Sequence, residues 1–227
     1  MLVAHDSQRV NQVLDRGGVS LRMRFLLPAA DSASPCVIIS HGLGSADDSM
    51  LAAFLSHQLL EEGIGVVMFD LNGQGGSASD KRGEEAYVED LEAISRWSAG
   101  RDDVDEDRIG IAALGEGAGI ALRAVRHGLA RPRVLALISP ELEPCGLVGV
   151  RAPTLVIAGA DDPALEALKT LVARSECATL TVLAGAGASF EESGALERCA
   201  GRAVDSLDAG FVGTAAWREW QDEGGGD

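Results

Sequence analysis

Positive charge is scarce in this sequence. Lysine and arginine together supply 19 residues against 35 aspartates and glutamates, and the formal net charge is −16 at pH 7. Phosphate backbones and anionic lipid headgroups both repel so acidic a chain. Nucleic acid and membrane surfaces are therefore excluded as partners.

Long apolar runs and paired cysteines are also missing. No run approaches the length of a membrane span, and the first residues lack a basic region followed by an apolar stretch. The cysteines, at Cys36, Cys145, Cys177 and Cys199, form no Cys-x-x-Cys pair and have no histidine at a metal-ligand spacing. We therefore expect small hydrophobic thiols in a reducing, cytoplasmic compartment, with no metal and no other cofactor.

Short apolar runs alternate with amphipathic patterns along the chain. The predicted strands are 19–27, 36–40, 65–69, 108–114, 134–138, 154–158 and 180–183, and the predicted helices are 49–62, 84–98, 116–127, 164–174 and 192–207. Alternation of this kind indicates an α/β protein with a doubly wound, mostly parallel sheet.

The length of 227 residues suits one domain with a full core. We predict that residues 19–208 form this domain, after an N-terminal segment, 1–18. An acidic, glycine-rich tail, 209–227, follows it, and we expect this tail to be flexible because its last residues carry little apolar surface.

A glycine turn joins a strand pattern to a helix pattern within residues 108–122. This is the form of a nucleophile elbow, whose pattern is Gly-x-Ser-x-Gly. Here residues 113–117 read Ala-Leu-Gly-Glu-Gly, so Gly115 stands where the attacking hydroxyl belongs. We expect a positive φ at Gly115, with Glu116 opening the helix.

Four further segments resemble motifs of the α/β-hydrolase superfamily, specifically its small, lid-less, dienelactone-hydrolase-like members. They are the Ser-His-Gly loop at 40–45, the Asp-Leu-Asn-Gly-Gln-Gly-Gly-Ser loop at 70–77, the strand and turn at 152–163, and the loop at 184–192. The resemblance covers residues 19–208 and implies an α/β-hydrolase fold without a cap domain.

The same resemblance implies a set of site positions. The triad acid falls at Asp162, the triad histidine position is taken by Ala188, and the backbone N–H groups of Leu43 and Glu116 stand for the oxyanion hole. His41, Asp70 and Cys145 are further candidates for the cleft.

The departures from the family pattern decide the functional hypothesis. The histidines are at positions 5, 41, 57 and 127, so none follows Asp162 in the chain. A serine hydroxyl needs a base to take its proton, and here both the hydroxyl and the base are missing. We predict a non-catalytic pseudo-hydrolase that binds a small molecule or a protein partner.

Two other functions remain open at this stage. One is an active ester or lactone hydrolase that uses His41, Glu116, Asp162 or Cys145 in the same cleft. The other is a structural subunit whose pocket is filled by its own side chains. A homo-oligomeric state is open for each of these hypotheses.

Several residues also have a purely structural interpretation. Asp162 lies in a Gly-x-Asp-Asp-Pro sequence that suits a turn and a helix cap. Glu116 favours the positive end of the helix dipole, and His41 is expected to bond a backbone group. The acidic run 101–108 lacks the glycine and the distal glutamate of a calcium loop, and it is interpreted as a solvated turn.

Overall fold

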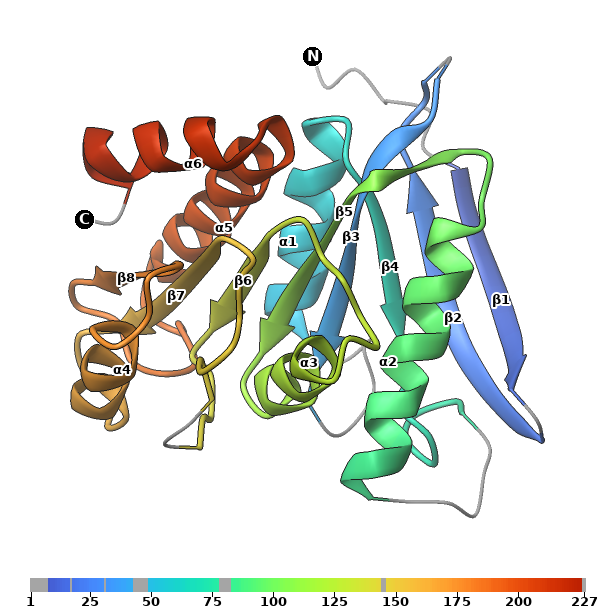
Figure 1. The fold of residues 1–227 in the computed structure, drawn as a ribbon, viewed down its shortest axis with the longest axis horizontal. Helices are drawn as coiled ribbons and strands as arrows, with labels where there is room; N and C mark the ends of the chain where they lie inside the picture. Colours follow the sequence, from blue (N-terminus) through green and yellow to red (C-terminus); the bar gives the residue numbers. More distant parts are fainter. Residues whose placement is uncertain are drawn as a thin grey trace.

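The protein, described by a computed structural model over residues 8–16, 18–30, 32–42, 49–77, 83–143 and 146–225, is built on one sheet. Eight strands form it in the order β1-β2-β4-β3-β5-β6-β7-β8 (Figure 1). The strands are β1 (Gln8–Arg16), β2 (Val19–Leu27), β3 (Ser34–His41), β4 (Gly65–Phe69), β5 (Val104–Leu114), β6 (Leu135–Ile138), β7 (Thr154–Gly159) and β8 (Ala178–Leu183). The helices are α1 (Met50–Glu61), α2 (Glu84–Ala99), α3 (Gly117–Arg126), α4 (Leu165–Val172), α5 (Ala195–Val212) and α6 (Thr214–Trp220), and α6 runs into a π-helical turn, η2 (Gln221–Gly225).

Most of the sheet is parallel, as predicted. Strands β3 to β8 pair in parallel, whereas β1 with β2 and β2 with β4 pair antiparallel. The parallel strands β4, β6 and β7 are buried at every residue. This explains their continuous apolar sequences, because helices cover both faces of a parallel sheet.

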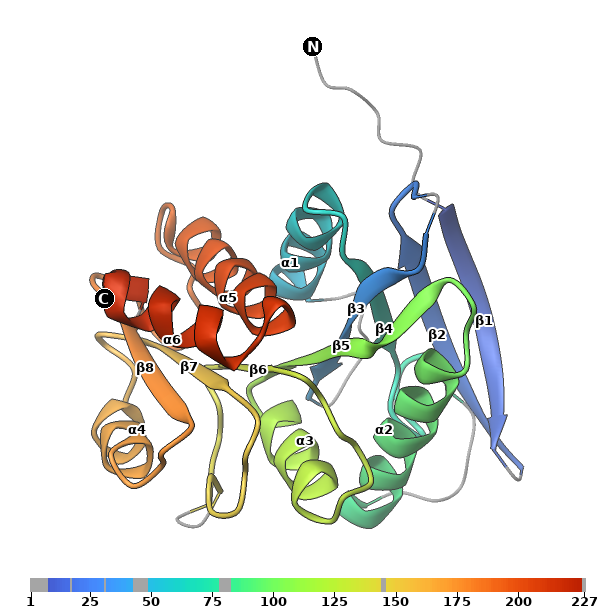
Figure 2. The ribbon, with the colours of Figure 1, turned by 45° about the horizontal axis from the view of Figure 1, so that its top comes forward.

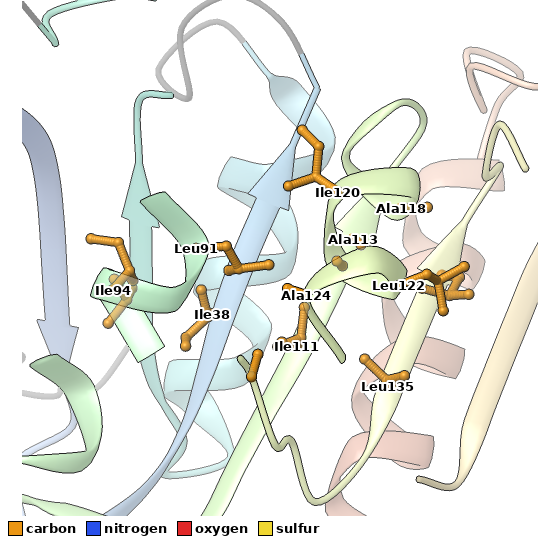
Figure 3. Close-up of a cluster of buried hydrophobic side chains, with 14 of the residues drawn as sticks. Ile38, Leu91, Ile94, Ile111, Ala113, Ala118, Ile120, Leu122, Ala124 and Leu135 are labelled. Atoms are coloured by element: carbon orange, nitrogen blue, oxygen red, sulfur yellow. The ribbon is translucent and has the colours of Figure 1, made fainter. Parts of the chain in front are cut away.

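Two helical layers cover the sheet. Helices α1, α5 and α6 lie on one face, and α2, α3 and α4 lie on the other (Figure 2). Each face has its own apolar cluster. In Figure 3, Leu91 and Ile94 of α2 lie near Ile38 of β3.

Helix α3 packs closely on the sheet through small side chains. Ala118, Ala121 and Ala124 are fully buried on α3, and Ala113 is fully buried on β5 beneath it (Figure 3). Alanine has little side-chain bulk, so the helix axis lies near the sheet at the point where β5 passes into α3.

Both ends of the described chain depart from the sequence prediction. Strand β1 lies inside the N-terminal segment 1–18, where no strand was expected, and pairs with β2 from Gln8 to Arg16. As an edge strand it has a largely polar sequence, which shows no clear strand pattern. At the other end, α5 runs past residue 208 to Val212, and α6 follows within the segment 209–227.

The boundary at residue 208 is therefore too early. The indole of Trp217 is 3% exposed, and its Nε1 donates to Ser206 Oγ of α5 at 3.1 Å. A buried indole supplies enough apolar area to fix a short helix against α5.

The prediction for the acidic run 101–108 is also partly wrong. We expected a solvated turn over the whole run, but strand β5 already begins at Val104.

An ion pair fastens the edge strand β1 to α2. Arg16 Nη2 lies 2.9 Å from Asp90 Oδ1, and Arg16 Nη1 lies 2.7 Å from Glu89 Oε2. The other Asp90 oxygen accepts from the backbone N–H of Asn72 at 2.7 Å. Burial raises the pKa of the Asp90 carboxyl above its ordinary value. The carboxyl therefore depends on these partners to stay charged inside the fold.

We predict that Arg16→Met lowers the free energy of unfolding by about 2–3 kcal/mol, because it leaves the buried Asp90 without its cation. The control is Arg96→Met, which removes a surface pair with Glu92 on the same helix and is expected to cost less than about 0.5 kcal/mol. Urea denaturation of both variants measures the difference. Equal losses would contradict a structural role for Arg16.

Candidate functional site

Gly115 forms the turn between β5 and α3. Its φ is +51°, in the left-handed region, as predicted. Its N–H donates to Ile138 O at 3.0 Å, and its carbonyl accepts from Ala118 N and Glu141 N, both at 3.2 Å. The backbone thus has the form of a nucleophile elbow, and glycine adopts this conformation without strain.

Space remains above the turn. A Cβ built on Gly115 would meet no other group within 4 Å. The residue is half-buried and lies at the carboxyl ends of the parallel strands. A side chain at this position would therefore point into open room.

Gly117 is held by a different constraint. A Cβ on this residue would lie 2.2 Å from the carbonyl oxygen of Ser40, at the end of β3. Ser40 Oγ in turn donates to Gly117 O at 3.4 Å. Only a glycine lets the first turn of α3 approach β3 this closely.

Glu116 opens α3 as its N-cap residue, as predicted. Its side chain is exposed and lies over Gly42, since a Cβ on Gly42 would be 3.1 Å from Glu116 Oε2. The carboxylate therefore covers the backbone that follows β3. The second predicted oxyanion group, Leu43, lies outside the described residues, so the predicted pair of N–H groups stays a prediction.

His41 and Asp70, two of the predicted cleft residues, are buried and hydrogen-bonded to backbone. His41 Nε2 donates to Phe69 O at 3.0 Å, which ties β3 to β4. Asp70 Oδ2 accepts from Gly76 N at 2.8 Å, and Asp70 O accepts from Ser77 Oγ at 2.7 Å. Both side chains thus shape the backbone around the cleft.

Asp162 lies in the turn after β7 and is 7% exposed. Its Oδ1 accepts from the backbone N–H of Ala164 at 2.8 Å, and its carbonyl accepts from Leu165 N at 3.0 Å. These bonds fasten the start of α4. The structural interpretation of Asp162 thus has a direct geometric basis.

Ala188 is exposed in the loop after β8, which packs against the turn that carries Asp162. Asp161 N donates to Ala186 O at 3.0 Å, and a Cβ on Gly159 would lie 2.1 Å from that same oxygen. The neighbouring Gly187 N donates to Glu192 Oε1 at 3.0 Å. The fold thus brings the predicted acid and histidine positions onto adjacent loops.

Two strained residues at this edge were not found by sequence reasoning. Among the described residues, Ser139 (φ +39°) and Phe190 (φ +53°) are the non-glycine residues with positive φ. Ser139 follows β6 and comes one residue after Ile138, which pairs with Leu114 before the elbow. Its Oγ is buried without a hydrogen-bond partner. Strain of this kind costs about 1–3 kcal/mol and gathers at functional sites.

A hollow of about 330 Å³ opens beside Glu116. Its walls come from the first turn of α2, from α3, and from residues 141–143 and 146. Cys145, a predicted cleft residue, lies outside the described residues. Among the other cysteines, burial raises the pKa of the Cys36 and Cys199 thiols to about 12, as expected for thiols packed in a core.

Known proteins are similar to this chain in sequence and in fold. A family model described as serine aminopeptidase, S33, matches residues 31–148. The chain belongs to this α/β-hydrolase family. As expected for lid-less members, the described residues between β6 and β7 form turns and no cap domain.

Solved α/β-hydrolases agree with the fold along most of their length. Est1E from Butyrivibrio proteoclasticus, in a structure with ferulic acid bound, is similar with a TM-score of 0.79 at 16% identity, covering 88% of this chain and 99% of that chain. Dienelactone hydrolase from Anabaena variabilis has a TM-score of 0.75 at 22% identity, covering 88% and 97%. At these identities the likeness shows the fold alone.

One protein that is similar in sequence carries a name that is not a hydrolase name. A putative phosphoribosyl transferase of Mycobacterium tuberculosis is 31% identical over 183 residues, which cover 74% of this chain and 40% of that protein. The chain therefore spans less than half the length of this relative, and the transferase name belongs to the longer protein.

Neither a membrane helix nor a metal cluster is found in the part of the chain that the structure describes. No described helix is long and apolar enough to cross a bilayer. No group of three or more His, Cys, Asp or Glu side chains in the same residues is placed to hold a metal ion.

We predict opposite tolerances for two glycines of the elbow. Gly117→Ala is expected to cost at least about 3 kcal/mol or to prevent folding, because its Cβ meets the Ser40 carbonyl. Gly115→Ala is expected to cost about 1–2 kcal/mol, from positive φ alone. Thermal and urea unfolding of both variants checks the order, and a Gly117→Ala protein as stable as Gly115→Ala would contradict it.

Proposed function

We propose that this α/β-hydrolase family member is a pseudo-hydrolase, which binds a ligand in the cleft at the elbow without Ser–His–Asp catalysis. The observation that carries the proposal is Gly115 itself. The turn that presents the nucleophile in this fold is formed, and the residue at its tip has no side chain.

The state of the other candidate groups supports this proposal. No histidine follows residue 127, so no imidazole follows β7 or β8, where the fold places its base. The Asp162 carboxylate already accepts from the backbone N–H of Ala164 just before α4, and His41 is buried against the Phe69 carbonyl. Each group thus has a structural task that is independent of catalysis.

The hollow beside Glu116 favours a binding protein over a purely structural subunit. A volume of about 330 Å³ is within the range of small-molecule sites, at its lower end. The ligand is therefore proposed to be small.

An active ester or lactone hydrolase with an unusual constellation is the competing function. We expect the protein to remain unlabelled by a serine-directed fluorophosphonate probe and to hydrolyse p-nitrophenyl acetate at the rate of a Gly115→Ala control. Activity gels and initial rates test this. Labelling that maps to one residue would overturn the proposal and identify the nucleophile.

A rescue experiment asks whether the hydrolase geometry survives. Gly115→Ser combined with Ala188→His is expected to raise p-nitrophenyl acetate hydrolysis at least about ten-fold, while each single change does almost nothing, because triad members act as a unit. The serine has open room, although its positive φ costs about 1–3 kcal/mol.

The matched control for the rescue is Gly115→Ala with Ala188→His, which carries the same backbone strain without a hydroxyl. Adding Asp162→Asn to the active pair should lower the recovered rate. A folded double variant whose rate equals that of the alanine control would mean that the cleft no longer holds triad geometry.

A further inference from the structure

The hollow beside the elbow has an apolar floor. Ile120 and Leu122 of α3 are 6% and 2% exposed, and Leu142 closes the far side from the loop after β6. Gly119, between them on the helix, leaves the space open, since a Cβ there would meet only Glu141 O at 3.9 Å. A ligand with an apolar body would fit against this surface.

The walls of the hollow carry an excess of negative charge. Four glutamates and two arginines line it. Arg123 Nη2 lies 2.6 Å from Glu84 Oε1 and 3.9 Å from Glu143 Oε1, and Arg126 is the other positive charge, so the lining keeps a net charge of −2. Glu116 and Glu141 lie on the elbow side of the same space.

The charge of the whole chain has the same sign. With a net charge of −16, the protein attracts cations toward its clefts and repels the carboxylate products of ester and lactone hydrolysis. Tyr87 adds an aromatic ring to the wall, and rings of this kind attract cations over their faces.

We propose that this hollow binds a small organic cation with an apolar body, an alkyl- or arylalkyl-amine. Its apolar part would lie over Ile120 and Leu142, and its ammonium would lie toward Glu141. The inference rests on the proposed binding function and adds the chemical class of the ligand.

Three probes of equal size test the ligand class. Isothermal titration with 4-phenylbutylamine, 4-phenylbutanol and 4-phenylbutyrate compares a cation, a neutral molecule and an anion with one apolar body. We expect the amine to bind at least about ten-fold more tightly than the alcohol, the butyrate not to bind, and the preference for the amine to fall as salt is raised.

Substitutions locate the site. Glu141→Gln should weaken amine binding about five-fold and leave the alcohol unchanged. Gly119→Leu fills the hollow and should abolish binding of both, with thermal unfolding used to check that the variant is folded. The control, Glu166→Gln, removes an exposed carboxylate on α4 that pairs with Lys169 and should change nothing.

The outcomes separate the two proposals. Equal binding of all three probes, a preference for the butyrate, or amine binding that survives Gly119→Leu would overturn the cation inference and leave a non-catalytic binder intact. Failure of every probe to bind would also overturn it. Labelling by the fluorophosphonate probe would instead overturn the proposed function.

Discussion

The approach of Gly117 to the carbonyl of Ser40 is the constraint on which the functional edge of the sheet depends. A backbone oxygen stands where a Cβ would be, so α3 can begin only because this residue has no side chain. That contact joins the end of β3 to the start of α3 and leaves Gly115 as the tip of the turn between them. Glu116, which opens α3 directly before Gly117, is positioned by the same contact.

The sequence predicted the interior of the fold well and its margins poorly. Strand β2 was placed at its observed limits by its alternating pattern, and β4 by its continuous run of apolar residues. Strand β1 was missed because an edge strand buries few side chains, so its sequence carries few apolar residues. Helix α6 was missed because its one buried residue, Trp217, packs through a contact with Ser206 on another helix.

At the candidate site, features set by local sequence were predictable, and features set by contacts between distant segments were not. The positive φ of Gly115 follows from a glycine between a strand and a helix pattern. The strain at Ser139 does not, because a serine before a proline carries no sign of a left-handed backbone. That conformation is imposed by pairing, since Ser139 N donates to Ile157 O on the neighbouring strand β7. The hollow likewise needs three segments far apart in sequence.

The way β1 is held has a consequence for synthesis on the ribosome. Its hairpin partner β2 emerges at once, but the strand that receives this hairpin into the sheet, β4, comes some forty residues later, and Asp90 on α2 later still. Until then the hairpin has an unpaired edge on each side, and isolated hairpins are marginal in water. Strand β1, although made before the strands and the helix that hold it, therefore becomes fixed only after Asp90 has left the ribosome.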